Sequence, residues 1–500
     1  MSDSSMKKTE VIKTRSGKVQ GYIDKGVNVF RGISYAEPPV GDLRFRPPVE
    51  IKPWTSILET TRFGFCSFQG YTHLEEWFGK SRVESEDCLT LNIWTPGTDD
   101  KKRPVMFWVH GGAFIVGSSK DPFYDGSFLS RRGDLVVVTI NYRLGALGYL
   151  YVKGEPANNG LLDQITALKW VKENIEFFGG DPNNITVFGE SAGAMSVSLF
   201  PAVPATKGLF QRMILQSVPY FDPATKETIS KSIISVLGMK ETDFEQLKSI
   251  PPERIIDAQN KMLANSLVIA LRPVIDGEIV LEHPLKVFQN GKCKDIDVMI
   301  GTNLNEGTVF TATQKFLGKK DEEHKRMVEN LLLRNGIESE KLSEVMELYK
   351  TTWKVNSHFD VLNAVLGDLL FRLYSIDLLD AQSRHQVNTF NYLFTWKSPM
   401  FDGKLGSCHI LELPFVFGTH EKPRMNRFVG TGSEVRKLSE KMMDAWIAFA
   451  HTGNPNHRDN LKWPPYDENK RSTMVFGEKC EIKEKIQEET RKIWENKLKY

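Results

Sequence analysis

Cysteine is scarce in this sequence, neither sign of charge is in excess, and no apolar run is long. Its five cysteines among 500 residues are too few for a disulfide scaffold, and their number is odd. The 65 basic and 63 acidic side chains leave a net charge of +2, which gives no electrostatic basis for binding nucleic acid or an anionic membrane. Apolar runs such as residues 135–140 are far shorter than the ~20 residues that a membrane-spanning helix needs. We therefore expect no nucleic-acid and no membrane partner, whereas these features do not indicate an oligomeric state.

Targeting and cofactor motifs are also missing. Residues 1–13 lack the apolar stretch of ~7–15 residues that a secretory signal requires, so we expect a cytoplasmic protein. The sequence contains no His-Glu-x-x-His zinc helix, no G-x-x-x-x-G-K-[ST] phosphate loop and no G-x-G-x-x-G dinucleotide turn. Because its 10 histidines are scattered, we expect no metal site and no cofactor.

What the sequence does contain is ample material for a folded core. Apolar residues make up 40% of the chain and include 10 Trp, 13 Tyr and 30 Phe, which excludes the disordered and fibrous classes. There is no internal repeat, low-complexity tract or long Gly/Ser linker. We therefore expect one domain over residues 1–500.

Short apolar segments alternate with helical patterns along the chain. Nearly continuous Val, Ile and Phe is typical of parallel strands that are buried on both faces. Residues 161–178 carry an apolar stripe at three- and four-residue steps, which predicts a helix. This order favours an α/β fold with right-handed crossovers. We expect helical excursions over residues 223–291 and 321–384, later helices near 435–450 and at the terminus, and strands at 19–22, 27–32, 89–94, 105–110, 135–141, 185–189, 213–216, 298–301, 389–394 and 474–476.

The most informative motif is Gly189-Glu190-Ser191-Ala192-Gly193, between an expected strand and an expected helix. This is the G-x-S-x-G pattern in the strand–turn–helix context that it needs. The serine takes a strained backbone conformation, while Gly189 and Gly193 lack the Cβ atoms that would keep strand and helix apart. The hydroxyl group of Ser191 is then held at the positive end of a helix, which makes it a candidate nucleophile.

A glycine pair follows an earlier strand, in His110-Gly111-Gly112-Ala113. Two residues without side chains let main-chain N–H groups point into a pocket, where they can stabilise a developing oxyanion. The N–H groups of Gly111 and Gly112, with that of Ala192 after the nucleophile, would form a hole with three donors. A Gly-Gly turn without chemistry is the plain alternative, and the neighbouring G-x-S-x-G motif favours the functional interpretation.

A serine nucleophile needs a base, and the base needs an acid that orients it. With this type of motif the chain order is Ser, then Asp or Glu, then His. Glu306 comes directly after the expected strand 298–301, as the acid should. His409 lies in a loop after strand 389–394 and is the candidate base, although a lone loop histidine is usually a solvated side chain. From order alone His385, His420 and His451 compete with it.

At this point the chain resembles the type-B carboxylesterase and cholinesterase family of α/β-hydrolases, and most closely its bacterial para-nitrobenzyl-esterase-like members. The resemblance covers nearly the whole chain. It rests on the segments already described and on residues 30–41, 85–93, 141–145, 160–164, 178–182 and 412–418. It implies an α/β-hydrolase fold: a large, mostly parallel central sheet flanked by helices, with helical cap excursions.

The resemblance implies a serine carboxylesterase that hydrolyses small-molecule carboxylic esters through an acyl-enzyme. Ser191 would be the nucleophile, Glu306 the triad acid and His409 the general base. The oxyanion hole would be formed by Gly111, Gly112 and Ala192. Glu190 and Ser217 match positions around the histidine, although a hydroxyl that caps the end of a strand explains Ser217 equally well.

Other matches to the family are better interpreted as structural. Arg44 with Glu86, and Arg143 with Asp163, match ion pairs that hold loops against the sheet. Cys66 and Cys88 match the first loop disulfide of the family, yet a reducing cytosol would keep both as thiols. Trp77 lies near the position of an ammonium-binding tryptophan of cholinesterases. A single Trp is more often a packing residue, so we do not predict choline esters as substrates.

Two other functions compete with ester hydrolysis. The first is a catalytically silent, cholinesterase-like binding module. Such modules usually lose a triad member and carry a membrane anchor, whereas this sequence retains all three residues and shows no anchor. The second is amide or lactone cleavage by the same triad, because the shape of the pocket decides which substrate is used.

Overall fold

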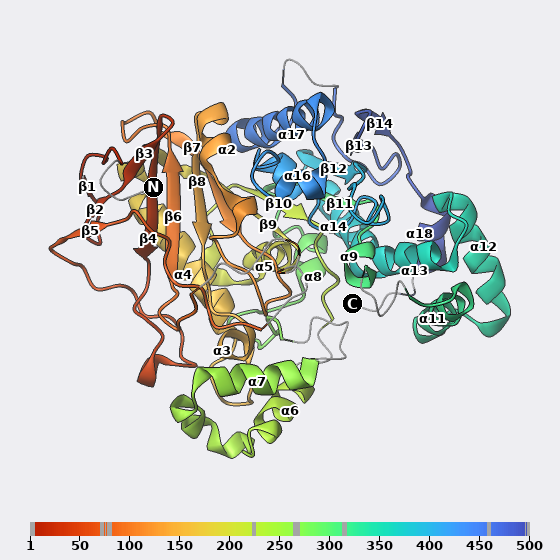
Figure 1. The fold of residues 1–500 in the computed structure, drawn as a ribbon, viewed down its shortest axis with the longest axis horizontal. Coiled ribbons are helices and arrows are strands. Elements are labelled where there is room, and N and C mark those ends of the chain that lie inside the picture. Colours follow the sequence, from red (N-terminus) through yellow and green to blue (C-terminus); the bar gives the residue numbers. More distant parts are fainter. Residues whose placement is uncertain are drawn as a thin grey trace.

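A single large sheet runs through the protein in the computed structural model, which describes residues 6–70, 75, 77, 83–222, 227–263, 271–312, 318–457, 462–495 and 497. The eleven strands of this sheet have the order β14-β13-β12-β11-β10-β9-β7-β8-β6-β4-β3, and a small sheet has the order β1-β2-β5 (Figure 1). The strands are β1 Ile12–Lys13, β2 Lys18–Gln20, β3 Tyr22–Asp24, β4 Val27–Ser34, β5 Ile57–Glu59, β6 Thr90–Thr95, β7 Arg103–Val109, β8 Val136–Ile140, β9 Gly180–Glu190, β10 Arg212–Gln216, β11 Asp297–Asn303, β12 Thr389–Phe394, β13 Thr473–Phe476 and β14 Glu481–Lys483.

The centre of the large sheet is parallel and its margins are antiparallel. Strands β13, β12, β11, β10, β9, β7 and β8 are parallel neighbours. The pairs β13–β14, β6–β8, β4–β6 and β3–β4 are antiparallel. The expected mostly parallel sheet is therefore confirmed, but residues 89–94 are wrongly predicted as a parallel strand. Every residue of β6 is buried, so its apolar run resembles that of a parallel strand although its neighbours run the other way.

The prediction of one strand over residues 19–22 is also wrong. The chain leaves β2 in the small sheet and enters β3 in the large sheet, with Gly21 between them. A Cβ atom at Gly21 would lie 2.1 Å from the carbonyl oxygen of Val29, so the chain passes too close to β4 for any side chain. The two- and three-residue strands β1, β5 and β14 are too short to produce a sequence pattern.

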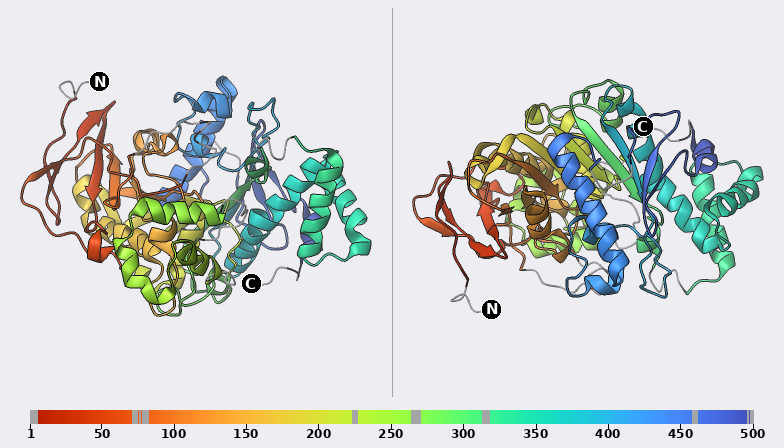
Figure 2. Two further views of the ribbon diagram at one scale, coloured as in Figure 1. Left: turned by 60° about the horizontal axis from the view of Figure 1, so that its bottom comes forward. Right: turned by 90° about the horizontal axis from the view of Figure 1, so that it is seen from above.

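Helices cover both faces of the large sheet, and α17 lies across one of them (Figure 2). The predicted helix 161–178 is confirmed as α4 followed by a 3₁₀ turn at Ile175–Phe178. The helices are α2 Ser127–Gly133, α3 Gly145–Tyr149, α4 Asn159–Asn174, α5 Ala192–Leu199, α6 Thr228–Val236, α7 Pro252–Leu263, α8 Pro284–Gln289, α9 Thr308–Thr311, α11 Asp321–Arg334, α12 Leu342–Trp353, α13 His358–Gly367, α14 Leu373–Ser383, α15 Leu413–Val416, α16 Met425–Val429, α17 Ser433–Thr452 and α18 Glu488–Trp494.

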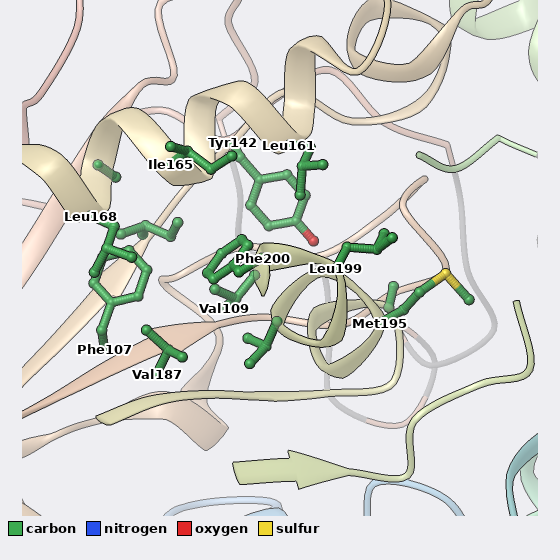
Figure 3. Close-up of a cluster of buried hydrophobic side chains, with 14 of the residues drawn as sticks. Phe107, Val109, Tyr142, Leu161, Ile165, Leu168, Val187, Met195, Leu199 and Phe200 are labelled. Carbon is green, nitrogen blue, oxygen red and sulfur yellow. The ribbon is translucent and has the colours of Figure 1, made fainter. Parts of the chain in front are cut away.

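Alternate residues of the central strands belong to two separate cores. In β7, Phe107 and Val109 join the core under α4 and α5, whereas Trp108 joins the core under α17. Figure 3 shows Leu161 and Ile165 pointing from α4 toward the side chains of β7 and α5. The sheet is thus buried on both faces, which is the three-layer arrangement that the apolar strands predict.

The two predicted helical excursions contain helices that extend away from the sheet. Helices α6 and α7 form a group below the sheet in Figure 1, and α11, α12, α13 and α18 form another at one end of it. The second group has its own apolar cluster, which includes Tyr349, Val361 and Trp494. Residues 223–226 and 264–270 of the first excursion lie outside the described residues. The division into a single domain stays a prediction. No described helix is long and apolar enough to cross a membrane.

Both predicted ion pairs are confirmed. Arg44 donates from Nε and Nη2 to the two carboxylate oxygens of Glu86, at 2.6 and 2.5 Å. Arg143 donates to Asp163 at 2.8 and 2.6 Å, and this second pair is fully buried between β8 and α4. Two parallel hydrogen bonds fix the geometry of each pair, so each holds a loop at a defined distance from its neighbour.

The buried pair generates a prediction about stability. We expect Asp163→Ala to lower the free energy of unfolding by about 3–5 kcal/mol, because it leaves the charge of Arg143 buried and uncompensated. Asp444→Ala breaks the partly exposed pair with Arg132 and should cost at most about 1 kcal/mol. Urea unfolding of both variants measures the difference. Equal losses for the two variants would contradict the structural role of the Arg143–Asp163 pair.

Candidate active site

Ser191 is the single residue between the end of β9 and the start of α5, where the chain makes a tight turn. Its backbone angles are φ 54° and ψ −124°, a strained conformation for a residue with a side chain. A Cβ atom on Gly193 would lie 2.0 Å from the carbonyl oxygen of Val109, and one on Gly189 would lie 2.6 Å from the carbonyl carbon of Gly193. Only glycine fits at both positions, as the G-x-S-x-G motif predicts.

The turn that carries Ser191 is anchored on the neighbouring strand. The main-chain N–H of Ser191 donates to the carbonyl oxygen of Gln216 at the end of β10, at 2.9 Å. The side chain of Ser191 is 7% exposed at the N-terminus of α5. Within the described residues, its Oγ makes no hydrogen bond to the protein. The strained turn therefore presents an accessible hydroxyl group that is not engaged elsewhere.

Glu306 and His409 contact each other directly. Glu306 Oε2 lies 2.6 Å from Nδ1 of His409. The two loops that carry them are joined by a parallel β-bridge between Asn305 and Cys408, the residues directly before the acid and the base. The other carboxylate oxygen, Oε1, accepts hydrogen bonds at 2.6 Å from the hydroxyl of Ser217 and from the main-chain N–H of Asn303. The Glu306 carboxylate is thus held by two donors while its other oxygen contacts the imidazole.

The second nitrogen of His409 faces another carboxylate. Nε2 lies 2.8 Å from Oε1 of Glu190, the residue directly before Ser191. Among the hydrogen bonds of the residues that the structure describes, none joins Ser191 to His409. The buried imidazole therefore lies between two carboxylates, but Nε2 forms no hydrogen bond to Glu190, whose Oε1 is buried without a hydrogen-bond partner.

These contacts change the proton affinity of the imidazole. Burial by itself lowers the pKa of His409, but the negative charges of Glu190 and Glu306 outweigh burial and raise it well above the ordinary value. Burial raises the pKa of Glu190, and the imidazolium only partly offsets this. The resting site therefore favours a protonated histidine.

The glycine pair lies directly beside the turn of Ser191. A Cβ atom on Gly111 would lie 3.1 Å from Cβ of Ser191 and 2.5 Å from Oε2 of Glu190. Gly112 has φ +108°, and a Cβ atom there would lie 2.1 Å from the carbonyl oxygen of Val116. Within the described residues, the main-chain N–H groups of Gly111, Gly112 and Ala192 donate to no protein acceptor. Three free donors are thus available around the serine.

The neighbouring His110 has a structural environment. Burial lowers its pKa to about 4, so the ring is neutral near pH 7. It stacks on Tyr142 with ring centroids 4.5 Å apart, and the hydroxyl of Tyr142 donates to the carbonyl oxygen of His110 at 2.7 Å. This packing holds the start of the glycine segment in place.

A polar layer that was not predicted from the sequence lies beside Glu306 and His409. Glu412 accepts hydrogen bonds from the side-chain amides of Gln216, at 3.0 Å, and Asn303, at 2.6 Å. Trp446 of α17 donates to Gln216 at 3.1 Å. Burial, followed by the nearby Glu190 and Glu306 charges, raises the pKa of Glu412 to about 8. The sequence feature that could have indicated this layer is Glu412 itself, a charged residue three positions after His409 in an otherwise apolar segment.

Two phenylalanines that were not predicted cover the imidazole. The ring centroid of Phe371 lies 4.6 Å from that of His409, and that of Phe310 lies 5.5 Å from it. Phe310 belongs to α9, directly after Glu306, and Phe371 belongs to a π-helical turn, Asp368–Arg372, which connects α13 to α14. The second helical excursion thus supplies one wall of the site.

The competing histidines bind elsewhere, and the cysteines of the predicted disulfide are not bonded to each other. His385 and His451 bind main-chain carbonyl oxygens of Gln289 and Gly133, away from Glu306. Cys66 and Cys88 are both buried and are not joined to each other, so the structure lacks the disulfide to which they were matched. Trp77 packs against Phe401, with ring centroids 5.6 Å apart. Among the described residues, no group of three or more His, Cys, Asp and Glu side chains is placed to hold a metal ion.

The chain is similar to known proteins along most of its length. The model of the carboxylesterase family matches residues 8–494. The chain is 35% identical to a para-nitrobenzyl esterase of Bacillus subtilis, over 96% of this chain and 98% of that protein. It is 34% identical to a phenmedipham hydrolase of Pseudarthrobacter oxydans, over 94% of this chain and 95% of that protein. The solved structure of a carboxylesterase of Geobacillus stearothermophilus superimposes with a TM-score of 0.84 at 34% identity, over 97% of this chain and 100% of that chain. The structure of a thermophilic para-nitrobenzyl esterase also superimposes with a TM-score of 0.84, at 33% identity, over 96% of this chain and 99% of that chain.

The two-carboxylate contact predicts an unusual titration of His409. We expect its imidazole to titrate well above the ordinary value of ~6.5 in an NMR titration. Glu190→Gln removes one of the two negative charges and should move this titration to lower pH. The exposed Glu253→Gln is the matched control and should leave it unchanged. A His409 titration that is the same in wild type and Glu190→Gln would contradict the contact.

Proposed function

Because the chain belongs to the carboxylesterase family and is a carboxylic ester hydrolase, we propose that it works through an acyl-enzyme. In this proposal Ser191 is the nucleophile, His409 is the general base and Glu306 is the acid that orients the base. The single observation that carries the proposal is the 2.6 Å contact between Glu306 and His409 beside the strained turn of Ser191.

The reaction begins with a movement of the His409 imidazole from Glu190 to Ser191. The imidazolium of the resting site first releases its Nε2 proton to bulk water. Substrate binding then excludes water, and Nε2 of the neutral His409 moves from Glu190 toward Oγ of Ser191. Oγ attacks the ester carbonyl carbon while its proton passes to Nε2. The resulting imidazolium lies between carboxylates, which stabilise its charge. Nε2 then gives the proton to the alkoxide that leaves as the alcohol.

The oxygen of the attacked carbonyl becomes negative in the transition state. We propose that the N–H groups of Gly111, Gly112 and Ala192 donate to this oxygen, because they have no protein acceptor within the described chain. Their fixed main-chain positions require little reorganisation during the reaction. Water then attacks the acyl-enzyme with His409 as its base, which releases the carboxylic acid and restores Ser191.

Ser217 and Glu190 have supporting roles in this proposal. The Ser217 hydroxyl donates to Glu306, which keeps that carboxylate directed at Nδ1 of His409. Glu190 stabilises the protonated base on its other side. Glu190 therefore stabilises the imidazolium intermediate. It also stabilises the imidazolium of the resting site, which must lose a proton before His409 can act as the base.

The substrate is proposed to be a small ester with an aromatic group. The Phe310 and Phe371 rings beside His409 offer apolar contact near the reacting carbon. One relative carries the name of a para-nitrobenzyl esterase, which supports this choice. We propose no cofactor and a cytoplasmic location. Amide or lactone cleavage by the same residues remains the second candidate, and turnover of matched aryl ester and anilide substrates distinguishes the two.

The role of Ser191 is tested by Ser191→Ala with a short-chain para-nitrophenyl ester. We expect kcat to fall by roughly 10⁴–10⁶-fold, because no other group can form the acyl-enzyme. Ser198→Ala, in the same helix, removes only a hydroxyl that donates to a main-chain carbonyl and should keep most of the activity. An organophosphate should label Ser191 in the wild type alone, as peptide mass spectrometry would show. Turnover by Ser191→Ala close to that of wild type would disprove the proposal.

The oxyanion hole is tested by Gly111→Ala. The added methyl group would collide with Glu190 and Ser191, so the N–H groups of the segment must move away from the reacting carbonyl. We expect kcat to fall by about 10²–10³-fold, the usual effect of losing one donor. Gly154→Ala adds a methyl group in open space, at a φ of +88° that strains alanine, so it should lower stability but change kcat little. Circular dichroism should show both variants folded, and an unchanged kcat in Gly111→Ala would count against the hole.

A further inference from the structure

The π-helical turn Asp368–Arg372 joins the candidate active site to the helical group of α11, α12, α13 and α18. The main-chain N–H of Leu373 donates to the carbonyl oxygen of Asp368, which is the hydrogen bond of a helix widened by one residue. The widened turn carries Phe371, whose ring centroid lies 4.6 Å from that of His409. Single π-turns inside helices are frequent at functional sites. This one places an aromatic ring on the proposed base.

A buried ion pair connects the first and last residues of the turn. Arg372 donates from Nε and Nη2 to the two carboxylate oxygens of Asp368, at 2.5 and 3.0 Å. Both side chains are buried. Two parallel hydrogen bonds fix the geometry of the pair, and separating two buried charges is strongly unfavourable. The pair therefore holds the backbone of the turn in one conformation.

Two other helices hold the carboxylate of this pair. Tyr349 of α12 donates its hydroxyl to Oδ2 of Asp368 at 2.7 Å, and Trp494 of α18 donates its indole N–H to the Tyr349 hydroxyl at 2.7 Å. Burial, followed by the charge of Asp368, raises the pKa of Tyr349 well above its ordinary value, so its hydroxyl stays protonated as a donor. Asp368, Arg372, Tyr349 and Trp494 thus form one buried network, although none of them belongs to the proposed triad.

The turn is also held at its arginine and at its main chain. Nη2 of Arg372 donates to the hydroxyl oxygen of Thr490 in α18 at 3.2 Å, and Nη1 donates to the carbonyl oxygen of Ile486 at 3.4 Å. The main-chain N–H of Tyr220 donates to the carbonyl oxygen of Leu370 at 2.7 Å. These contacts leave the aromatic ring of the turn little freedom to move.

The start of the turn lies against the acid of the site. A Cβ atom on Gly367, the residue before the turn, would lie 3.5 Å from Cβ of Glu306. One on Gly307 would lie 2.6 Å from the carbonyl oxygen of Asn363 in α13, so only glycine lets the two segments approach this closely. One fixed segment therefore contacts the acid directly and the base through Phe371.

We propose that Asp368 and Tyr349 are positioning residues for His409, because they fix the π-helical turn that presses Phe371 against the imidazole. The ring covers one face of the imidazole and limits the orientations that its side chain can adopt. Neither Asp368 nor Tyr349 touches the reacting atoms, so both act through the ring of Phe371. This role rests on the proposed function, since the position of His409 matters for catalysis only if His409 is the base.

Tyr349→Phe tests the role by two measurements, the proton NMR signal of Hε1 of His409 and the hydrolysis of a short-chain para-nitrophenyl ester. His409→Gln assigns the signal, and Phe371→Leu shows where it lies without the neighbouring ring. We expect Tyr349→Phe to move the signal toward its position in Phe371→Leu, because the ring leaves its place on the imidazole. We expect kcat to fall about tenfold with KM little changed, since a misplaced base slows the chemical step and the network touches no substrate.

Two control variants separate this role from general effects on the fold. Tyr466→Phe also removes a hydroxyl that donates to a buried carboxylate at 2.7 Å, that of Asp380 further along α14. Val345→Ala removes apolar contacts of α12 in the same cluster as Tyr349 but leaves the network intact. Both should leave the His409 signal and kcat unchanged. Asp368→Asn should lower kcat further, by about 10²-fold. If it fails to fold, Tyr349→Phe, which removes a single hydroxyl, still decides.

Three results would overturn the role of the network. They are a His409 signal that Tyr349→Phe leaves in place, a moved signal with unchanged kcat, and the same changes in Val345→Ala. The NMR signal reports the ring contact whether or not His409 is the base. Failure of the proposed function, seen as turnover by Ser191→Ala, is therefore distinguishable from failure of the positioning role.

Discussion

The site depends on one buried imidazole held between two carboxylates. Glu306 contacts Nδ1 of His409 at 2.6 Å and Glu190 contacts Nε2 at 2.8 Å. Two negative groups can lie this close in a buried site only if a positive charge lies between them, or if one of them takes up a proton. The hydroxyl of Ser217 and the N–H of Asn303 add neutral donors that stabilise Glu306. In the proposed mechanism, the positions of these groups determine whether His409 can accept the proton of Ser191.

The sheet brings these residues together because they follow adjacent parallel strands. Ser191 follows β9, Ser217 follows β10 and Glu306 lies just beyond β11, while His409 is in the loop after β12. Strands β9 to β12 are parallel neighbours in that order, so all four residues lie at the same edge of the sheet. The carboxyl edge of a parallel sheet is where α/β proteins usually bind their ligands. Long segments of chain separate the residues in sequence, yet each is only one strand from the next.

Local patterns in the sequence predicted the residues whose chemistry requires a particular turn or order. The tight turn at Ser191 needs glycines on both sides, and those glycines are visible in the sequence. The central strands were visible as apolar runs, but the direction of β6 was not, because burial on both faces removes the alternation that distinguishes antiparallel strands. The contact of Glu190 with His409 was implied only by the resemblance to the family. The Glu412 amide layer and the Phe371 wall join segments far apart in the chain, and no local pattern records such contacts.

We propose that His409 exchanges Glu190 for Ser191 during catalysis. A crystal structure of the protein after reaction with an aryl phosphonate tests this exchange, because the adduct is a stable analogue of the tetrahedral intermediate. We expect phosphorus bonded to Oγ of Ser191, Nε2 of His409 within hydrogen-bond distance of Oγ, and Nδ1 still on Glu306. We also expect a phosphonyl oxygen that accepts from the N–H groups of Gly111, Gly112 and Ala192. Phosphorus on another residue, or an imidazole that stays on Glu190 while the phosphonyl oxygen points away from these amides, would contradict the exchange.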